Sequence, residues 1–425
     1  MSPTEKSITK TQLFCLIVIV GLASSVLTLP SVLAAEAGRD LWAAVIISFA
    51  AYSAVFFAVV QVYRLNPDTD IYTVLKKSIG TAGAKIIFAV LAVFFGYKTL
   101  TLFRETEEFC LNKLFQSLPW HFYAVILTAL IAFIAARGLK SLARCGELSL
   151  VFITASLLVC LGAAAGQADA GRLLPVLENG FAPAFKGFYK TAAWYGDSLL
   201  LLMVMGRVKV DKKVPAMMYA GYGITALVLT GFMLAYYALY GSISGFQGHG
   251  QAFANITNFS RDSSMGLVSS IFNQFWLLAC FIKAAALFWA LNEAVRGVLG
   301  VRQITNYNVQ ITNSGAAARA VKCQGDGVSD TRCQLLRPRD TEQVKGEKLV
   351  TRSVNYSVPV TVILAVIIYI LDVFVFKAAD AAFYMSAAYV NYAAMGIYAG
   401  LPAIALICAA VYRKNGKGQT GKRQS

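Results

Sequence analysis

Long apolar stretches recur along the chain, and short polar segments separate them. A helix rises about 1.5 Å per residue, so about 20 apolar residues cross the hydrocarbon core of a bilayer, which is about 30 Å thick. Each stretch is bounded by charges, prolines or glycines. The pattern predicts an all-α membrane protein with about ten transmembrane helices. The candidate spans cover residues 11–35, 40–63, 84–104, 119–136, 145–166, 186–206, 215–241, 266–291, 355–376 and 390–412.

One long polar segment, 302–352, interrupts this pattern. It is rich in Gly, Asp, Thr, Gln and Arg and lacks an apolar period, which is typical of a mobile loop. We therefore expect a single transmembrane domain over 1–425 with a cytoplasmic loop insertion at 302–352. The insertion could dock a partner or have no role of its own. It contains Cys323 and Cys333, and a disulfide between them would not persist in the cytoplasm.

The composition favours lipid as the main solvent. Hydrophobic residues make up 57% of the chain and charged residues 14%, whereas soluble domains average about 25% charged residues. So few charges are not enough to cover a large soluble surface. The first apolar run, 11–35, is too long for the apolar core of a cleavable signal peptide, so we expect it to remain as a span.

The basic residues set the expected orientation. The net charge is +16, but the Lys and Arg residues cluster in short runs between spans, where the positive-inside bias acts. With the N-terminus inside, 28 of the 38 Lys and Arg residues fall in inside segments, 8 in outside segments and two within spans. Both termini are therefore expected in the cytoplasm, and nucleic acid is not an expected partner.

Two spans carry the marks of a broken helix. In span one, Gly21 tolerates unusual dihedral angles, and Pro30 cannot donate a backbone hydrogen bond. The hydroxyls of Ser24 and Ser25 could satisfy backbone groups freed between them. Span six holds a glycine and a carboxylate near its middle, in the sequence AAWYGDS over 192–198.

Breaks in spans one and six of ten suggest a five-plus-five inverted repeat. In that architecture the two broken helices meet near the membrane midplane. Half-helix N-termini attract an anion there, and half-helix C-termini offer carbonyls to a cation. Such a site suits a zwitterion. The alternative is that Gly21 and Pro30 only kink a structural helix.

Three charges lie inside predicted spans. A charge within the membrane costs about 2.5–3.5 kcal/mol on insertion scales, so Asp197, Lys98 and Lys283 are expected to face the bundle interior. Asp197 can pair with either lysine, as a ligand or proton group or as a structural pair that fixes helix packing. Asp372 and Glu293 lie near span ends, where we expect them to reach water.

Span three also carries polar residues. Tyr97 and Thr101 are one turn apart and share a face, which could line a cavity or bond to neighbouring helices. Glu105, Glu107 and Glu108 follow at the outer end of this span, where we expect them to be solvated.

The sequence gives little sign of catalysis. His121 and His249 lie in or next to outer loops, and no metalloprotease, nucleophile-elbow or phosphate-loop motif occurs. No cysteine pair has the spacing of a metal site. We therefore expect no enzymatic activity, no cofactor and no metal.

Several segments together carry a family resemblance. They are residues 8–14 (ITKTQLF), Gly21, 27–30 (LTLP), 37–42 (AGRDLW), 194–197 (WYGD), 275–300 and 400–414. The chain resembles the endospore germination permease family, the B subunit of germinant receptors, over nearly its whole length. That family is a branch of the amino acid–polyamine–organocation transporter superfamily.

The resemblance implies a LeuT-like fold in which a small germinant, usually an amino acid, binds between spans one, three, six and eight. The protein would lie in the spore inner membrane. It would assemble with two other receptor subunits, one membrane-embedded and one a lipoprotein, and ligand binding would start germination. Two departures stand out: the loop 302–352 is longer than expected, and Asp197 stands where a glutamate is expected.

The expected ligand site combines the breaks, the polar positions and the resemblance. The backbone of Gly21, Ser24 and Ser25 is expected to hold a carboxylate, and the segment Tyr195–Asp197 an ammonium group. The candidate ligand-binding residues are Gly21, Ser24, Ser25, Tyr97, Thr101, Tyr195, Gly196, Asp197, Lys283 and Leu287.

Three other functions fit the same scaffold. The first is an amino-acid transporter driven by protons through Asp197 or Lys283. The second is a passive pore for water or ions. The third is a structural scaffold for partner subunits, in which the loop 302–352 matters and the pocket does not.

Overall fold

The computed structural model describes residues 7–113, 119–165, 168–240, 263–300, 321–324, 332–335, 357–375 and 387–421. A few side chains within these ranges, including Ser24, lie outside the described part. The chain divides into a helical unit, Met1–Gly300 with Ser357–Ser425, and a small unit, Val301–Tyr356.

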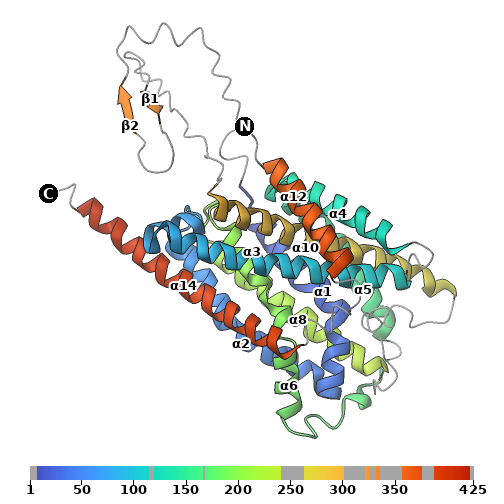
Figure 1. Cartoon of the computed structure of the whole chain (residues 1–425). Helices are drawn as coiled ribbons and strands as arrows, with labels where there is room; N and C mark the ends of the chain where they lie inside the picture. The colour runs from blue at the N-terminus through green and yellow to red at the C-terminus, as the bar shows by residue number, and fades with distance from the viewer. Residues whose placement is uncertain are drawn as a thin grey trace. The chain divides into compact units, whose positions relative to one another are not determined.

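Long helices build the helical unit (Figure 1). They are α1 (Lys10–Ala37), α2 (Leu41–Leu65), α3 (Ile71–Lys113), α4 (Trp120–Ala136), α5 (Leu139–Ala165), α8 (Val214–Tyr240), α10 (Ser263–Leu299), α12 (Ser357–Ile370) and α14 (Ala388–Gly421). Span six is divided into α6 (Ala182–Lys190), the 3₁₀ segment η4 (Ala192–Leu199) and α7 (Leu200–Val204). Short 3₁₀ turns lie at η2 (Gly38–Asp40) and η3 (Ala170–Leu173), and a π-helical turn, η5 (Leu371–Val375), ends α12.

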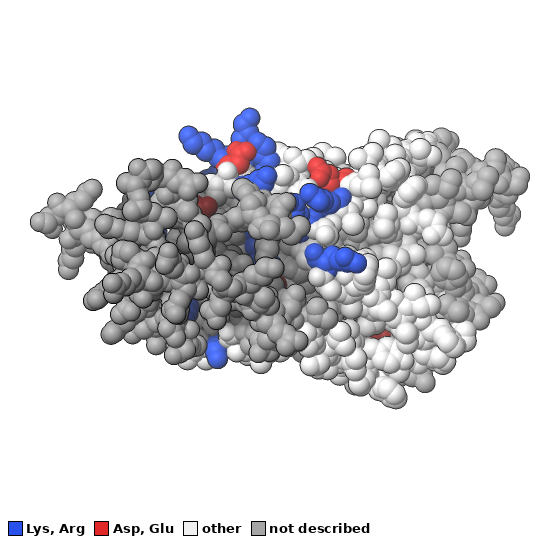
Figure 2. Space-filling model, turned by 90° about the horizontal axis from the view of Figure 1, so that it is seen from above, with Lys and Arg blue, Asp and Glu red and all other residues white. Residues whose placement is uncertain are grey.

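This arrangement confirms the helical membrane fold. Six described helices are long and apolar enough to cross a membrane, and four shorter apolar helices accompany them. Large apolar side chains are exposed on α4, α5 and α12, as expected of surfaces that face lipid. They include Phe122, Ile126, Leu148, Val151, Val362 and Ile363. On the face seen in Figure 2, most of the charged side chains in view gather in one area, and most of the other described surface is uncharged.

Two helices form the middle of the bundle. α1 packs against α5, α6, α8 and α10, and α10 packs against α3, α4 and α5. Trp194 of η4 and Trp276 of α10 are buried, and both donate their ring N–H to residues of α1. Because lipid does not drive apolar helices together, close packing and internal hydrogen bonds must hold such a bundle.

The break predicted in span one is wrong. α1 is α-helical from Lys10 to Ala37 and contains Pro30 within it. The ring N–H of Trp276 donates a hydrogen bond to the carbonyl of Ala23, at 2.7 Å, next to the expected break. Membrane helices tolerate proline and glycine when neighbouring side chains satisfy backbone groups, so the sequence LTLP did not require an interruption.

The start of the chain is tied to the segment after α7. Thr9 begins α1 with a capping box, because its hydroxyl accepts from the amide of Gln12 while the Gln12 side chain accepts from the amide of Thr9. Ile8 pairs in parallel with Val208. The Lys10 ammonium lies 2.6 Å from the Asp211 carboxylate. These contacts form an N-terminal tether between residues 8–10 and 207–211.

The small unit contains the exception to the all-α expectation. Within it the structure describes two antiparallel strands, β1 (Val321–Gln324) and β2 (Arg332–Leu335). Their register places Cys323 opposite Cys333. The polar composition of 302–352 carried no alternation that would have predicted this hairpin.

The tether gives the first prediction. The hydrogen bond from Lys10 holds the pKa of Asp211 below its ordinary value of about 3.9. The contribution of this pair is therefore present above that value and is lost only as the pH falls through the lower pKa. Replacing Lys10 with Gln should raise deuterium exchange at the Ile8 and Lys209 amides a few-fold, by the same ratio throughout pH 5–8.

The matched control for this experiment is Lys212→Gln, which changes an exposed lysine beside Asp211. It should leave exchange at both amides unchanged. The Asp211 carboxylate stays ionised between pH 7 and pH 5. If the ratio of exchange rates between Lys10→Gln and the unchanged protein became smaller over that range, the ion pair would not be the cause of the protection.

Candidate functional site

The site begins at the break in span six. α6 ends at Lys190, and the chain continues as a 3₁₀ segment from Ala192 to Leu199 before α7 starts. The sequence there includes Gly196 and Asp197, which were the residues that predicted the break. A mid-span change from α to 3₁₀ geometry frees backbone groups, and these must find partners inside the protein.

Side chains from other helices satisfy the freed groups at Ala193. Its carbonyl accepts from the Lys98 ammonium at 3.0 Å and from the Tyr398 hydroxyl at 2.9 Å. Its amide donates to the side-chain oxygen of Asn391 at 3.1 Å, and the Asn391 amide donates to the carbonyl of Lys190. Side chains of α3 and α14 therefore stabilise the 3₁₀ segment at the break.

Sequence reasoning missed Asn391 and Tyr398. An asparagine in an otherwise apolar span was the available signal, because a buried amide needs partners. Tyr398 had no such signal, since tyrosine is common in membrane helices. Its ring fills the space beside Gly196, and a Cβ at that glycine would overlap the Tyr398 ring.

A buried ionic triad stands next to the break. The Asp197 carboxylate pairs through one oxygen with Lys98 at 3.0 Å and through the other with Lys283 at 2.5 Å. The side chains are 8%, 4% and 1% exposed, respectively. The sequence predicted Asp197 pairing with either lysine, and the structure brings both to it, from α3 and α10. One carboxylate between two ammonium groups leaves an excess of one positive charge if all are ionised.

Glu105 places an acidic side chain near this triad. Its carboxylate accepts from the Thr28 hydroxyl at 3.0 Å, and the Thr28 oxygen accepts from the Trp194 ring N–H at 2.9 Å. The Glu105 side chain is buried, so the expectation that it is solvated is wrong. Hydrogen bonds thus connect the C-terminal half of α3 through α1 to the break in span six.

Glu107 and Asp372 are also buried, against the expectation that both reach water. Glu293 is partly buried and pairs with Arg207 and with Arg296, the latter at 3.0 Å. Depth along a span does not show whether a neighbouring helix covers that face. Within the described residues no group of three His, Cys, Asp or Glu side chains could hold a metal ion. His249 lies outside the described residues.

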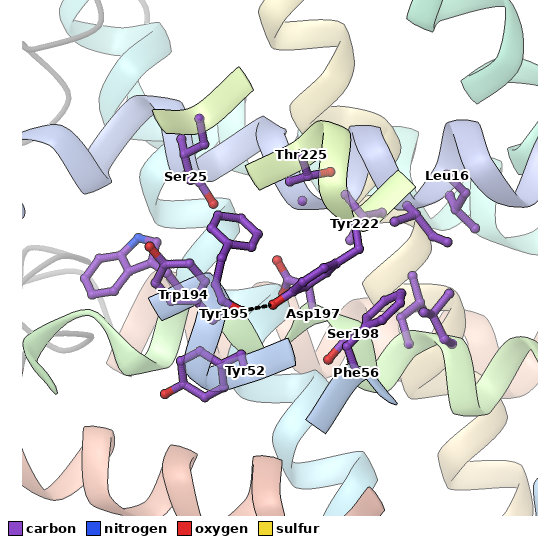
Figure 3. Close-up of a pocket in the computed structure, with 17 residues that line it drawn as sticks. Leu16, Ser25, Tyr52, Phe56, Trp194, Tyr195, Asp197, Ser198, Tyr222 and Thr225 are labelled. Carbon is purple, nitrogen blue, oxygen red and sulfur yellow. Dashed lines mark hydrogen bonds between the residues drawn. The ribbon is translucent and has the colours of Figure 1, made fainter. Parts of the chain in front are cut away.

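A cavity of about 60 Å³ opens beside the triad, between α1, α2, η4–α7 and α8 (Figure 3). Figure 3 shows Tyr195, Tyr222 and Asp197 close together near its centre. Its wall consists of Leu16, Ile17, Val20, Gly21, Ser25, Phe49, Tyr52, Phe56, Trp194, Tyr195, Asp197, Ser198, Leu200, Leu201, Tyr222, Thr225 and Leu229.

The cavity has an aromatic side and a polar side. Tyr52 stacks on Tyr195 with centroids 5.4 Å apart, and Phe56 stacks on Tyr222 with centroids 4.4 Å apart. The polar groups come mostly from α1, η4 and α8. They are Asp197, Ser25, Ser198 and Thr225. The three tyrosines of the wall, Tyr52, Tyr195 and Tyr222, each add a hydroxyl group.

Four of the candidate residues meet at this cavity: Gly21, Ser25, Tyr195 and Asp197. The others lie elsewhere. Gly196 faces Tyr398, and Lys283 reaches Asp197 from α10. The Thr101 hydroxyl donates to the carbonyl of Lys98 on its own helix, while Leu287 and the Tyr97 hydroxyl are buried outside the cavity wall. The Ser24 side chain lies outside the described part.

The cavity also uses helices that the sequence reasoning did not select. α2 and α8 contribute Tyr52, Phe56, Tyr222 and Thr225, in place of residues from spans three and eight. Aromatic positions in an apolar stretch look alike whether they face lipid or a cavity. No signal in this sequence distinguished them.

The model for the family described as "Spore germination protein" matches residues 7–312. The chain belongs to the spore germination protein family. This agrees with the resemblance drawn from the sequence segments. Spore germination protein KB of Bacillus subtilis (strain 168) is 25% identical over 228 residues, which cover 53% of this chain and 59% of that protein. The match thus spans less than two thirds of this relative's length.

The fold of this chain is also similar to that of a solved structure. A Na⁺-coupled sialic acid symporter in a substrate-bound outward-open state aligns with a TM-score of 0.59 at 10% identity, over 95% of this chain and 80% of that one. MhsT in complex with L-phenylalanine aligns with a TM-score of 0.47 at 14% identity, over 94% and 98%. The symporter alignment shows that the fold is that of the LeuT-like transporters, and family and fold are those of permeases.

The packing of Tyr398 on the break gives the second prediction. Gly196→Ala should lower the unfolding temperature in detergent, because the new methyl group must displace the Tyr398 ring from a filled space. Overpacking of this kind costs about 1–3 kcal/mol. Gly223→Ala on α8 is the control, since a Cβ there meets no atom within 4 Å. Equal unfolding temperatures for the two variants would show that the ring is not fixed against the break.

Proposed function

We propose that this protein is the membrane subunit of a spore germinant receptor, which senses a small nutrient in the cavity beside Asp197 and starts germination. Family membership supports the role in germination. The observation that carries the ligand-binding part is the small cavity at the break of span six, with a buried carboxylate in its wall. Binding sites in transporters of this architecture lie at such breaks.

The chemistry of the wall favours an amino acid. The Asp197 carboxylate can face an ammonium group, while the hydroxyls of Ser25 and Ser198 can donate to a carboxylate. The Thr225 hydroxyl already donates to the carbonyl of Gly221, so it can only accept from a ligand. The cavity, of about 60 Å³, is small. We therefore propose a small amino acid whose side chain lies against the aromatic side.

The unbroken α1 bears on how such a ligand would be held. Backbone amides of Gly21, Ser24 and Ser25 are engaged in a helix, so they can bind a carboxylate only if α1 opens there. We propose that the ligand-bound state has this opening, at the glycine that meets Thr225 across the cavity. A ligand changes the conformation only by binding one state better than the other, and such an opening would supply that difference.

The remaining parts of the proposal follow from the family and the charges. The protein would lie in the inner membrane of the spore with both termini in the cytoplasm, as the distribution of Lys and Arg favours. It would assemble with a second membrane subunit and a lipoprotein. We propose the polar unit 301–356 as a contact for these partners.

The main alternative is a proton-coupled amino-acid transporter. The structural likeness to a sialic acid symporter supports it, because the same fold carries solute in that protein. A buried triad of Asp197 with two lysines could exchange a proton during such a cycle. Cavity and fold serve both functions equally, so only the fate of the ligand distinguishes them.

The third prediction concerns that fate. Purified protein in liposomes should bind at least one small amino acid from a radiolabelled panel, without accumulating it inside. Binding is read on detergent-solubilised protein and uptake on sealed vesicles with and without a proton gradient. Uptake that collapses with the gradient would establish the transporter instead. Absence of both, with a folded protein, would overturn the cavity as a ligand site.

The fourth prediction concerns Gly21. A Cβ at this position would lie 2.6 Å from the Thr225 methyl group, inside the cavity wall. Gly21→Ala should therefore weaken amino-acid binding at least about tenfold, which corresponds to about 1.4 kcal/mol. Gly223→Ala, two residues before Thr225 and in open space, should bind as the unchanged protein does. The unfolding temperature of each variant shows whether a loss of binding comes from a loss of folding. If Gly21→Ala binds the amino acid with unchanged affinity, Gly21 is not part of the binding site.

A further inference from the structure

A second group of buried charges lies on α3, apart from the cavity. Arg104 and Glu107 of α3 pair at 2.9 Å, and Asp372 of η5 lies 3.8 Å from the Arg104 guanidinium. The side chains of Glu107 and Asp372 are 2% and 1% exposed, and that of Arg104 is 12% exposed. The two carboxyl groups face each other.

The charges of this group do not balance. Two carboxylates and one guanidinium leave one negative charge if all are ionised. Among the described residues, neither carboxyl has another ion-pair partner than Arg104. One Glu107 oxygen and both Asp372 oxygens accept no hydrogen bond. A buried carboxylate without partners is costly, and two adjacent carboxylates cannot both stay charged without a cation between them.

The other polar groups around the pair do not supply that charge. Tyr123 of α4 donates its hydroxyl to the sulfur of Cys110, and both groups are neutral. Glu105 and Glu108 on α3 are acidic, so they add to the imbalance. Lys98 and Lys283 are bound to Asp197 in the ionic triad.

We propose that Glu107 and Asp372 form a proton-binding site that holds one proton between their carboxyl groups. The shared proton joins one oxygen of each carboxyl group: one carboxyl donates its O–H and the other accepts. The turn that carries Asp372 supports this reading, because π-helical turns within α-helices occur frequently at functional sites. The site needs no amino-acid ligand, so it stands independently of the proposed receptor function.

The occupancy of this site would act on α12. When the proton is present, the pair holds the last turn of α12 against α3. When it leaves, two negative charges face each other in a dry place, and the helices must separate or admit water or a cation. Proton uptake at this site is therefore tied to the packing of span nine on span three.

The fifth prediction tests the site by infrared difference spectroscopy in nanodiscs. At neutral pH the protein should show a protonated-carboxyl band that Glu107→Gln and Asp372→Asn each remove. Both amides are isosteric with the neutral acid, so the fold should survive. Glu108→Gln, one residue further along α3 and half-buried, is the control and should keep the band. A spectrum that neither variant changes relative to the control would overturn the proposal.

A second measurement covers a variant that fails to fold. If the folded pair holds a proton that the unfolded chain releases at neutral pH, the unfolding temperature should fall as the pH rises from 6 to 8. Asp372→Asn should lose that pH dependence, while Glu108→Gln should retain it. Stability that instead depends on the Na⁺ or K⁺ concentration, in the unchanged protein only, would show a metal cation between the carboxyls and overturn the proton site.

Discussion

The buried Asp197 carboxylate between Lys98 and Lys283 is the interaction on which the helical unit depends. Its three members come from the break in span six, α3 and α10, so one cluster joins three elements far apart in the sequence. Removing one partner of a buried pair leaves an uncompensated charge, which is far more costly than the pair is stabilising. The triad therefore fixes where the break lies and where α3 and α10 cross it. Lys98 also bonds to the Ala193 carbonyl, so the same side chain satisfies the opened backbone.

The cavity exists because this arrangement keeps span six from closing into a regular helix. Tyr398 and Asn391 occupy one side of the break, and the opposite side faces α1, α2 and α8. Asp197 thus lies at a boundary, with lysines on one side and the cavity on the other. A ligand ammonium that approaches this carboxylate competes with two protein ammonium groups. If the proposed ligand binds at this site, the triad must loosen as it does so, which would tie binding to the positions of the helices.

The break in span six and the charges of the triad could be predicted from the sequence, because such residues carry a high free-energy cost inside a membrane. A charge and a glycine inside an apolar stretch are expensive, so Asp197, Gly196 and the lysines stood out. Features of low cost could not be predicted. Pro30 and Gly21 are tolerated within α1, and aromatic residues of α2 and α8 look alike on any face. Glu105, Glu107 and Asp372 were misjudged because their sequence positions give depth in the membrane but not the neighbours that cover them.

The placement of both charge clusters on one helix bears on how ligand binding can reach the rest of the molecule. Lys98 and Glu107 are nine residues apart on α3, or about 13 Å along its axis. A shift of α3 that loosens the triad also moves Glu107, which faces Asp372 of span nine. The two clusters are coupled through α3 only if the helix has two positions and each cluster changes which of them it favours. In the two proposals, the triad would favour one placement of α3 while Asp197 has no ligand, and the carboxyl pair would favour one while it holds its proton. A rigid α3 then makes the two preferences compete, so a ligand at one cluster would change proton binding at the other by the same factor in both directions.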